Sequence, residues 1–277
     1  MGRTLGRLAR EAGYEIGDLV CLSLRSARSA ARFIGAGRPQ ASESARLSQA
    51  DFVLISTPDD KIPYAIGIIE NNIAGVGRAA VLHTSGALSS DVLGSLIAHG
   101  LSAGSCHPLQ TFANPARSLA LVRGCYFCIE GEQRAVTLAR RFVRRIGARY
   151  FEIPTRMKGL YHGAAVLASG GVVALLATSL DMLSRCGLGE SEAIKILLPL
   201  VEGTIANLRA AGPARSLSGP VRRGDVGTVE ENIRAIASVD ADWLRVYRLL
   251  AERSLPLAER AGIDKASLVE LRRILNE

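Results

Sequence analysis

The chain begins Met1-Gly2-Arg3-Thr4-Leu5-Gly6-Arg7-Leu8, and this stretch decides how the sequence after it is interpreted. Leu5, Leu8 and Ala9 recur at the spacing of one face of a helix, shortly after a glycine. A glycine in this place is typical of the last glycine of a G-x-G-x-x-G turn, where a helix N-terminus faces the pyrophosphate of a dinucleotide. An ordinary amphipathic helix would show the same spacing, so the remaining sequence has to distinguish the two interpretations.

The composition is that of a globular chain rich in arginine. Its 277 residues are 48% hydrophobic, which is enough for one large domain or two smaller ones. The net charge of +8 comes mainly from arginine, because lysine occurs only at Lys61, Lys158, Lys195 and Lys265. The arginines are scattered and few aromatic residues lie among them, which favours solvated helix faces over a nucleic-acid surface. We therefore expect no nucleic-acid partner.

The five cysteines lack the paired spacing of a zinc site. Cys125 and Cys128 form a C-x-x-C, but it lies in an apolar, strand-like run that would point the two thiols to opposite faces. The first residues do not show a charged region followed by an apolar one, as a secretion signal would. We expect a cytoplasmic protein without a bound metal.

The first half of the chain alternates short apolar runs with helical patterns, which predicts a parallel sheet covered by helices. The predicted strands are residues 18–24, 51–56, 79–84, 101–105, 124–129 and 149–153, and the predicted helices among them are residues 26–34, 62–71, 89–98 and 132–146. After Pro154 the pattern is helical, with helices predicted at 157–186, 190–211, 224–238, 241–261 and from 265. We predict an α/β domain over residues 1–154 and an all-helical domain over residues 155–277.

One segment requires a membrane test, because residues 163–180 carry no charge over nearly the minimum length of a spanning helix. Glycine, alanine, serine and threonine are frequent in it, so its hydrophobicity per residue is low. We interpret the segment as a buried central helix whose small residues let a neighbouring helix or a second subunit approach closely. We expect no membrane partner.

The sequence after the first predicted strand contains a candidate phosphate site. An acidic residue that would bind the ribose 2′-OH of NAD is missing there, and Arg25 and Ser26 follow instead. A guanidinium beside a hydroxyl and a helix N-terminus suits a 2′-phosphate, which predicts NADP as the cofactor. A plain serine N-cap followed by solvated arginines is the alternative. The turn that would lie beneath the same cofactor consists of Ser56, Thr57, Pro58 and Asp59.

Two further polar segments, residues 83–88 and 107–112, follow predicted strands. The carboxyl ends of parallel strands meet at one edge of a sheet, so these segments would converge on one crevice. A single histidine after a strand also has a purely structural interpretation. We expect the substrate to contact Ser85, Gly86, His107 and Gln110.

Lys158 and His162 lie one helical turn apart at the start of the long helix, with Ser169 on the same face. Such a pair can protonate or deprotonate a substrate oxygen or nitrogen while a hydride moves. The alternative is a solvated lysine beside a buried, hydrogen-bonded histidine. We predict that Lys158 and His162 are catalytic and that Ser169 contacts the substrate.

Five motifs in this order resemble those of a bacterial family: T-P-D-D-x-I from Thr57, H-x-S-G-A from His83, H-P-L-Q-T-F from His107, K-x-x-Y-H from Lys158 and S-G-P-x-x-R-G-D from Ser218. The chain resembles Rossmann-like proteins with a C-terminal domain of unknown function. These are similar in plan to pyrroline-5-carboxylate reductase, ketopantoate reductase and the 6-phosphogluconate and 3-hydroxyacid dehydrogenases. The resemblance implies a Rossmann-type NADP-binding domain, with Gly2 and Arg3 at the cofactor, and a 6-phosphogluconate-dehydrogenase-like helical domain that forms a homodimer.

The chain departs from that family at two places. Family members usually carry a strand and G-x-G-R-x-G before the first helix, and Ser-Asn where this chain has Ser169 and Gly170. The missing strand would be central in the sheet, and at a strand spacing of about 4.8 Å its loss would leave a gap of about 9 to 10 Å. We expect an upstream start of the reading frame, a rearranged sheet, or another segment or chain in that position.

The resemblance implies an NADP-dependent oxidoreductase that transfers a hydride between the nicotinamide and a small carbonyl or imine substrate. The alternative is a catalytically silent nucleotide sensor or scaffold built on the same fold. The sequence itself does not name a substrate.

Overall fold

The computed structural model describes residues 1–112 and 114–277, which form two compact units, Met1–Ser169 and Gly170–Glu277. The change from strands to helices occurs near Pro154, as the sequence predicts. The boundary between the two compact units lies further along the chain, after Ser169, because helix α8 (Lys158–Val166) packs with the first unit. The catalytic candidates on α8 therefore belong to the strand-containing unit.

The described strands form two separate sheets. Strands β1 (Asp18–Cys21) and β2 (Arg38–Ala41) pair in parallel, and the second sheet has the order β3-β4-β5-β6-β7. Its strands are β3 (Phe52–Ile55), β4 (Ala80–His83), β5 (Ser102–Pro108), β6 (Tyr126–Gly131) and β7 (Arg149–Glu152). No backbone ladder joins β1 to β3 within residues 1–112 and 114–277, so the sheet is interrupted where the sequence predicts a gap.

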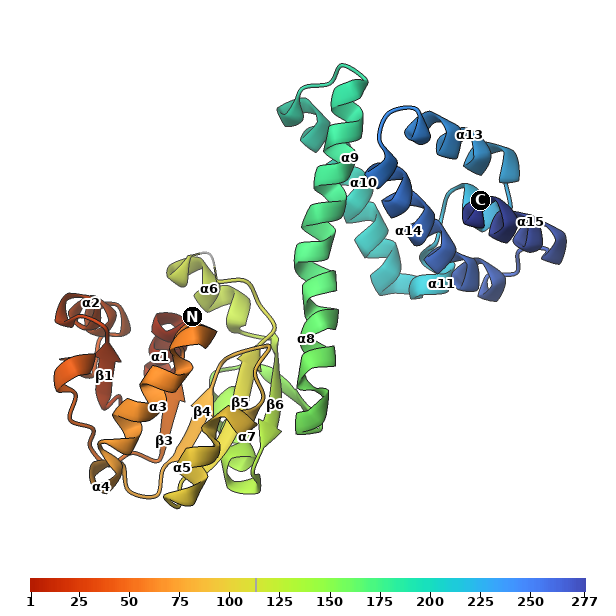
Figure 1. Ribbon diagram of the computed structural model, residues 1–277. Coiled ribbons are helices and arrows are strands. Elements are labelled where there is room, and N and C mark those ends of the chain that lie inside the picture. The colour runs from red at the N-terminus through yellow and green to blue at the C-terminus, as the bar shows by residue number, and fades with distance from the viewer. Residues whose placement is uncertain (113) are drawn as a thin grey trace. The chain divides into compact units, whose positions relative to one another are not determined.

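Helices cover both faces of the larger sheet (Figure 1). Besides α8, the first unit has α1 (Gly2–Glu11), α2 (Leu24–Ile34), α3 (Ile62–Glu70), α4 (Ile73–Val76), α5 (Gly94–Ala98), α6 (Pro115–Val122) and α7 (Gln133–Arg145). Alternation along β4 produces the two layers, because Leu82 packs under α1 and α7 whereas Val81 packs under α3 and α5. This is a three-layer α/β/α unit.

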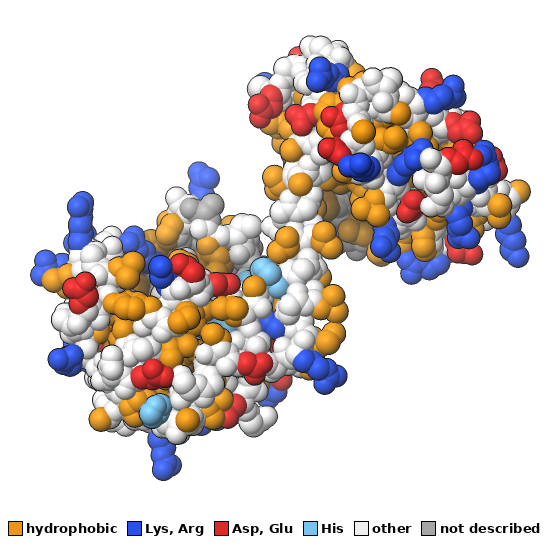
Figure 2. All heavy atoms as spheres, viewed as in Figure 1, with side chains coloured by type: hydrophobic (Ala, Val, Ile, Leu, Met, Phe, Trp, Pro, Cys, Tyr) orange, Lys and Arg blue, Asp and Glu red, His pale blue; other side chains and the backbone are white. Residues whose placement is uncertain are grey.

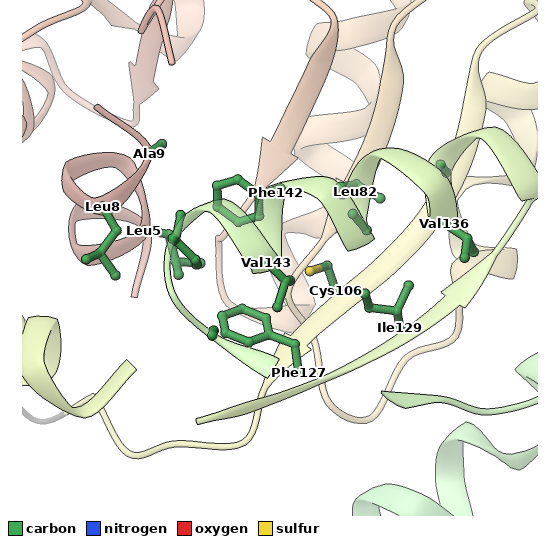
Figure 3. Packing of buried hydrophobic residues seen from close by; sticks show 14 of the residues in the cluster. Leu5, Leu8, Ala9, Leu82, Cys106, Phe127, Ile129, Val136, Phe142 and Val143 are labelled. Carbon is green, nitrogen blue, oxygen red and sulfur yellow. The ribbon is translucent and has the colours of Figure 1, made fainter. Parts of the chain in front are cut away.

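Helix α1 is held by the apolar stripe that the sequence predicts. Leu5 and Leu8 are almost fully buried, and Figure 3 shows them beside Phe142, Val143 and Phe127. Burial of one such leucine side chain contributes about 1.5 to 3 kcal/mol. These contacts fix the N-terminus of α1 at the edge of the sheet where β3, β4 and β5 end.

The second unit contains helices only, within the described residues. They are α9 (Val172–Arg185), α10 (Glu190–Ala211), α11 (Pro213–Ser216), α12 (Pro220–Arg223), α13 (Val226–Ala237), α14 (Ala241–Arg260) and α15 (Lys265–Asn276). Their core gathers Val221, Val229, Leu255 and Leu271, together with neighbours on α14 and α15.

The long apolar helix is not buried in the single chain. The continuous helical stretch Thr155–Arg185 is the one described helix that is long and apolar enough to cross a membrane, with a mean hydropathy of 1.8 in its most apolar window. None of that window is buried, so the interpretation of residues 163–180 as a buried central helix is wrong for one chain by itself. Glycine, serine and alanine give it little side chain to pack, and a π-helical turn interrupts it at Leu167–Gly171.

Other differences from the predicted elements have local causes. Strand β2 escapes prediction because it is short and contains Pro39. Strand β5 continues to Pro108, which places His107 on the strand and not in the loop after it. Strand β6 runs antiparallel to β5, so the sheet is parallel only within β3-β4-β5 and within β6-β7.

Arginine and lysine side chains are spread over the face seen in Figure 2 and do not gather in one patch. Several are engaged by neighbours, as the Arg140 guanidinium is by both carboxylate oxygens of Glu152 at 2.7 and 2.6 Å.

Candidate functional site

A cavity of about 390 Å³ lies at the carboxyl ends of β3, β4 and β5. It is lined by Met1, by residues 56–59 after β3, by residues 84–86 after β4, by His107 of β5 and by His162 of α8. The structure thus brings the predicted cofactor turn, Ser85, Gly86 and both predicted histidines to one place. All of these residues belong to the first compact unit.

Gly2 allows α1 to begin directly against the turn after β3. A Cβ on Gly2 would collide with the hydroxyl of Ser56, so a larger residue requires either that hydroxyl or the helix to move. Met1 is the N-cap, no side chain caps the helix, and its first turn contains no acidic residue. The first N–H groups of α1 and the positive end of its dipole are therefore available to an anion.

The turn at residues 84–88 is fixed by Ser85. The hydroxyl of Ser85 donates to Oδ2 of Asp59 at 2.8 Å and accepts from the N–H groups of Ala87 and Leu88 at 3.2 and 3.0 Å. The two turns that follow β3 and β4 are tied together by these bonds, which gives the cavity a rigid wall.

His83 is a structural residue behind that wall. It is fully buried, its Nδ1 accepts from the N–H of Ser85 at 3.2 Å, and its Nε2 lies 3.1 Å from the carbonyl oxygen of Ser89. Burial lowers the pKa of His83 to about 4, and the charge of Lys158 adds to this effect. His83 is therefore neutral at pH 7, with the proton on Nε2 donated to Ser89.

His107 and His162 meet over Gly86. A Cβ on Gly86 would lie 2.6 Å from Nδ1 of His162 and 2.8 Å from Nε2 of His107, so only glycine leaves room for both rings. Nδ1 of His107 lies 2.6 Å from the hydroxyl of Tyr161. Nδ1 of His162 is buried without a hydrogen-bond partner within the part of the chain that the structure describes. The cavity wall thus holds one anchored imidazole and one with an unpaired nitrogen.

Lys158 lies behind the cavity and does not line it. Its side chain is 1% exposed, and its Nζ donates to Oγ of Ser105 at 2.6 Å. The ammonium lies 5.6 Å from the ring centre of Tyr161, a cation–π contact. Burial lowers the pKa of Lys158. Its charge in turn adds to the burial that lowers the pKa of His107 to about 4.

Other predicted site residues lie away from this cavity. Arg25 is exposed on α2, and the N–H of Ser26 donates to Oγ of Ser23, which is the N-cap in its place. Gln110 contacts the backbone of Thr111 and Leu121. Ser169 lies in the exposed π-helical turn.

The cysteines do not form a nucleophilic or metal-binding site. All five are free, and the described residues contain no cluster of three metal-ligating side chains. Burial raises the pKa of Cys106 to about 12 and that of Cys128 to about 11, so both stay protonated thiols.

Sequence reasoning did not assign a role to Tyr161 or Ser105. Tyr161 forms part of the K-x-x-Y-H motif, three residues after Lys158, but its partner His107 is 54 positions away in sequence. Ser105 is an ordinary strand residue whose hydroxyl contacts Lys158 only because α8 packs on β5. The K-x-x-Y-H motif could have identified Tyr161 as a site residue, whereas nothing in the sequence distinguishes Ser105 from other strand residues.

A sheet of the Rossmann type with a cavity at its strand ends, followed by an all-helical unit, is an α/β fold of the 6-phosphogluconate-dehydrogenase plan. Residues 125–254 match the family model described as domain of unknown function (DUF2520). The resemblance to Rossmann-like proteins with a C-terminal domain of unknown function is thereby confirmed.

Solved structures agree with this fold over nearly the whole chain. A protein from Thermotoga maritima is 28% identical with a TM-score of 0.76, and the match covers 93% of this chain and 96% of that one. An imine reductase from Streptomyces aurantiacus has 17% identity and a TM-score of 0.64, covering 98% and 95% of the two chains. An imine reductase from Myxococcus stipitatus in complex with NADP+ has 13% identity and a TM-score of 0.62, covering 98% and 96%. No curated protein matches the sequence.

Proposed function

We propose that this protein is an NADP-dependent oxidoreductase that transfers a hydride between the nicotinamide and a small carbonyl or imine substrate. The observation that carries the proposal is the cavity in which the N-terminus of α1 meets two histidines, one from β5 and one from α8. The fold shared with imine reductases supports the same class of reaction.

The residues at the N-terminus of α1 fit a dinucleotide. The close approach of Gly2 to Ser56 and the uncapped first turn of α1 suit a pyrophosphate. Arg3 and Arg25 would hold the 2′-phosphate as guanidinium partners, and Ser26 would join them once its N–H leaves Ser23. When bound, the nicotinamide supplies or accepts the hydride; residues 56–59 would lie beneath its ribose.

His162 and Lys158 have different places in this proposal. His162 lines the cavity and exchanges the proton with the substrate oxygen or nitrogen. Lys158 lies behind the cavity wall, where its charge favours the neutral form of His107. It also donates to the hydroxyl of Ser105, which in turn donates to the carbonyl oxygen of Ser85 and so supports the turn after β4. Ser85, Gly86 and His107 form the substrate wall, while Gln110 and Ser169 would take part only after a local rearrangement.

The proposal is tested by titrating the full chain with NADPH and with NADH, followed by calorimetry. We expect NADPH to bind more tightly, and we expect a panel of small ketones, aldehydes, keto acids and imines to contain a compound that oxidises NADPH. No binding at millimolar NADPH would overturn the proposal. Binding without turnover across the panel would favour the silent nucleotide sensor.

We propose further that the protein is a soluble, cytoplasmic homodimer joined through its helical unit. The support is the exposed apolar surface of α9 and α10, where Val173 is 68% exposed and Leu200 is 67% exposed. Light scattering should give twice the monomer mass, and Val173→Glu should give a monomer. Val269→Glu is the matched control, because Val269 on α15 is about as exposed as Val173. Recovery of the wild type in the membrane fraction would contradict the proposal.

A further inference from the structure

Tyr161 connects α8 to the strand that carries His107. Its hydroxyl lies 2.6 Å from Nδ1 of His107, and its ring packs edge-on against Phe151 with 5.8 Å between ring centres. The same ring lies under the ammonium of Lys158. The phenol is therefore held in place on several sides, and it fixes the orientation of the imidazole.

Both partners of this bond are neutral at pH 7. Burial raises the pKa of Tyr161, and burial, with Lys158 and His162, lowers the pKa of His107 to about 4. A phenol is the better donor and a neutral imidazole nitrogen the better acceptor, so the Tyr161 hydroxyl donates to Nδ1. The ring proton of His107 is then on Nε2.

The geometry directs that second nitrogen to the cavity. His107 lines the cavity, its Nδ1 is taken by Tyr161, and its Nε2 lies over Gly86, beside His162. A neutral Nε2–H at this place can donate a hydrogen bond but cannot accept one. It suits an atom with a free lone pair and repels an N–H group.

We propose that Tyr161 is a positioning residue that presents His107 as a fixed Nε2–H donor to a carbonyl oxygen, so that the substrates are ketones or aldehydes and not iminium ions. This inference rests on the proposed function. An iminium nitrogen has no lone pair that could accept the hydrogen bond from Nε2–H of His107.

Reduction of a carbonyl needs one hydride and one proton. The carbonyl carbon would receive the hydride that reduced nicotinamide supplies, the π electron pair of the C=O bond would move to the oxygen, and His162 would supply the proton that completes the alcohol. His107 keeps its proton throughout. Its hydrogen bond strengthens as negative charge develops on the oxygen, which is how a fixed donor lowers the barrier.

The first test needs neither substrate nor cofactor. In the full chain labelled with ¹⁵N-histidine, NMR should show the Nε2–H tautomer for His107, and Tyr161→Phe should give a mixture of both tautomers. Tyr126→Phe, a half-exposed tyrosine that contacts Arg149 and lies outside the cavity, is the matched control and should leave the signals unchanged. An Nδ1–H tautomer in the wild type would overturn the inference.

The second test uses turnover with NADPH. Tyr161→Phe should reduce kcat for the best ketone or aldehyde about tenfold, the rate equivalent of one lost neutral hydrogen bond, without changing NADPH affinity. Carbonyl compounds should react faster than cyclic imines of the same size that are protonated to iminium ions at pH 6. Faster imine turnover, or an unchanged kcat in Tyr161→Phe, would refute the inference. Loss of NADPH binding in the wild type would instead remove the proposed function and leave the tautomer result intact.

Discussion

Gly86 is the residue at which His107 of β5 and His162 of α8 come together. Its φ lies outside the left-handed region, so glycine is required for space and not for backbone conformation. Nδ1 of His162 and Nε2 of His107 both lie within 3 Å of the position that a Cβ would occupy at Gly86. A single methyl group therefore competes with both imidazoles.

Gly86→Ala should displace these rings and reduce turnover by at least about tenfold, since misplacing a catalytic group by an ångström can cost far more. NADPH binding is measured in parallel, because Gly86 lines the same cavity as Met1 and residues 56–59. Gly94→Ala is the control, as nothing lies within 4 Å of a Cβ at Gly94. Equal kcat values for the two variants would show that the ring positions are not needed.

Lys158→Met tests the charge behind the cavity wall. The pKa of His107 should rise above about 4 in this variant but stay below the ordinary value, because burial is the larger cause of its shift. An NMR titration of His107 measures this without any substrate. We also expect kcat to fall about tenfold, equivalent to about 1.4 kcal/mol in the barrier. An unchanged His107 titration would show that Lys158 does not act on His107.

At the scale of elements, the important contact is between α1 and the end of β3. The buried stripe of α1 sets its direction, and Gly2 sets how closely its N-terminus approaches Ser56. The uncapped first turn then faces the cavity through Met1. Strand pairing from β3 to β5 keeps the turns after these strands level with that helix end.

Gly2→Ala should therefore weaken NADPH binding, because the new methyl group collides with the Ser56 hydroxyl and displaces either that hydroxyl or the helix N-terminus from its place beside the pyrophosphate. The double variant Gly2→Ala with Ser56→Ala should recover most of the affinity, since the nearest remaining atom, the Cβ of residue 56, lies at 3.3 Å. Calorimetry with NADPH measures both. If the double variant binds no better than the single one, the collision is not the cause.

At the scale of the whole molecule, buried histidines couple stability to pH. His83 has a pKa of about 4 in the folded protein, whereas the ordinary pKa of a histidine side chain is 6.5. Between these values the unfolded chain binds the extra proton, so the free energy of unfolding falls as the pH is lowered from 6.5 to 4. The slope for one such histidine is about 1.4 kcal/mol per pH unit.

His83→Gln should therefore lose less stability than the wild type between pH 7 and pH 5, although it starts lower because the bonds to Ser85 and Ser89 are weakened. Urea unfolding at the two pH values measures the difference. His99→Gln, an exposed histidine on the same unit, should keep the wild-type slope. Parallel curves for the wild type and His83→Gln would contradict the assignment.

The sequence by itself determined most of the elements and the edge at which the site lies. Apolar runs such as residues 51–56 and 79–84 identify buried strands, and the polar residues that follow must gather at one sheet edge when the strands are parallel. The stripe of Leu5, Leu8 and Ala9 likewise identifies the buried face of α1. These features are local in the chain, which is why spacing and residue type suffice to predict them.

The tertiary structure alone decided which side chains touch. Lys158 and His162 share a helix face, yet packing of α8 on β5 buries the lysine against Ser105 and leaves the histidine at the cavity. The bond of Tyr161 to His107 and the reversed direction of β6 were equally beyond prediction. Each depends on how distant segments pack and on the burial that results, and neither is encoded in the spacing of neighbouring residues.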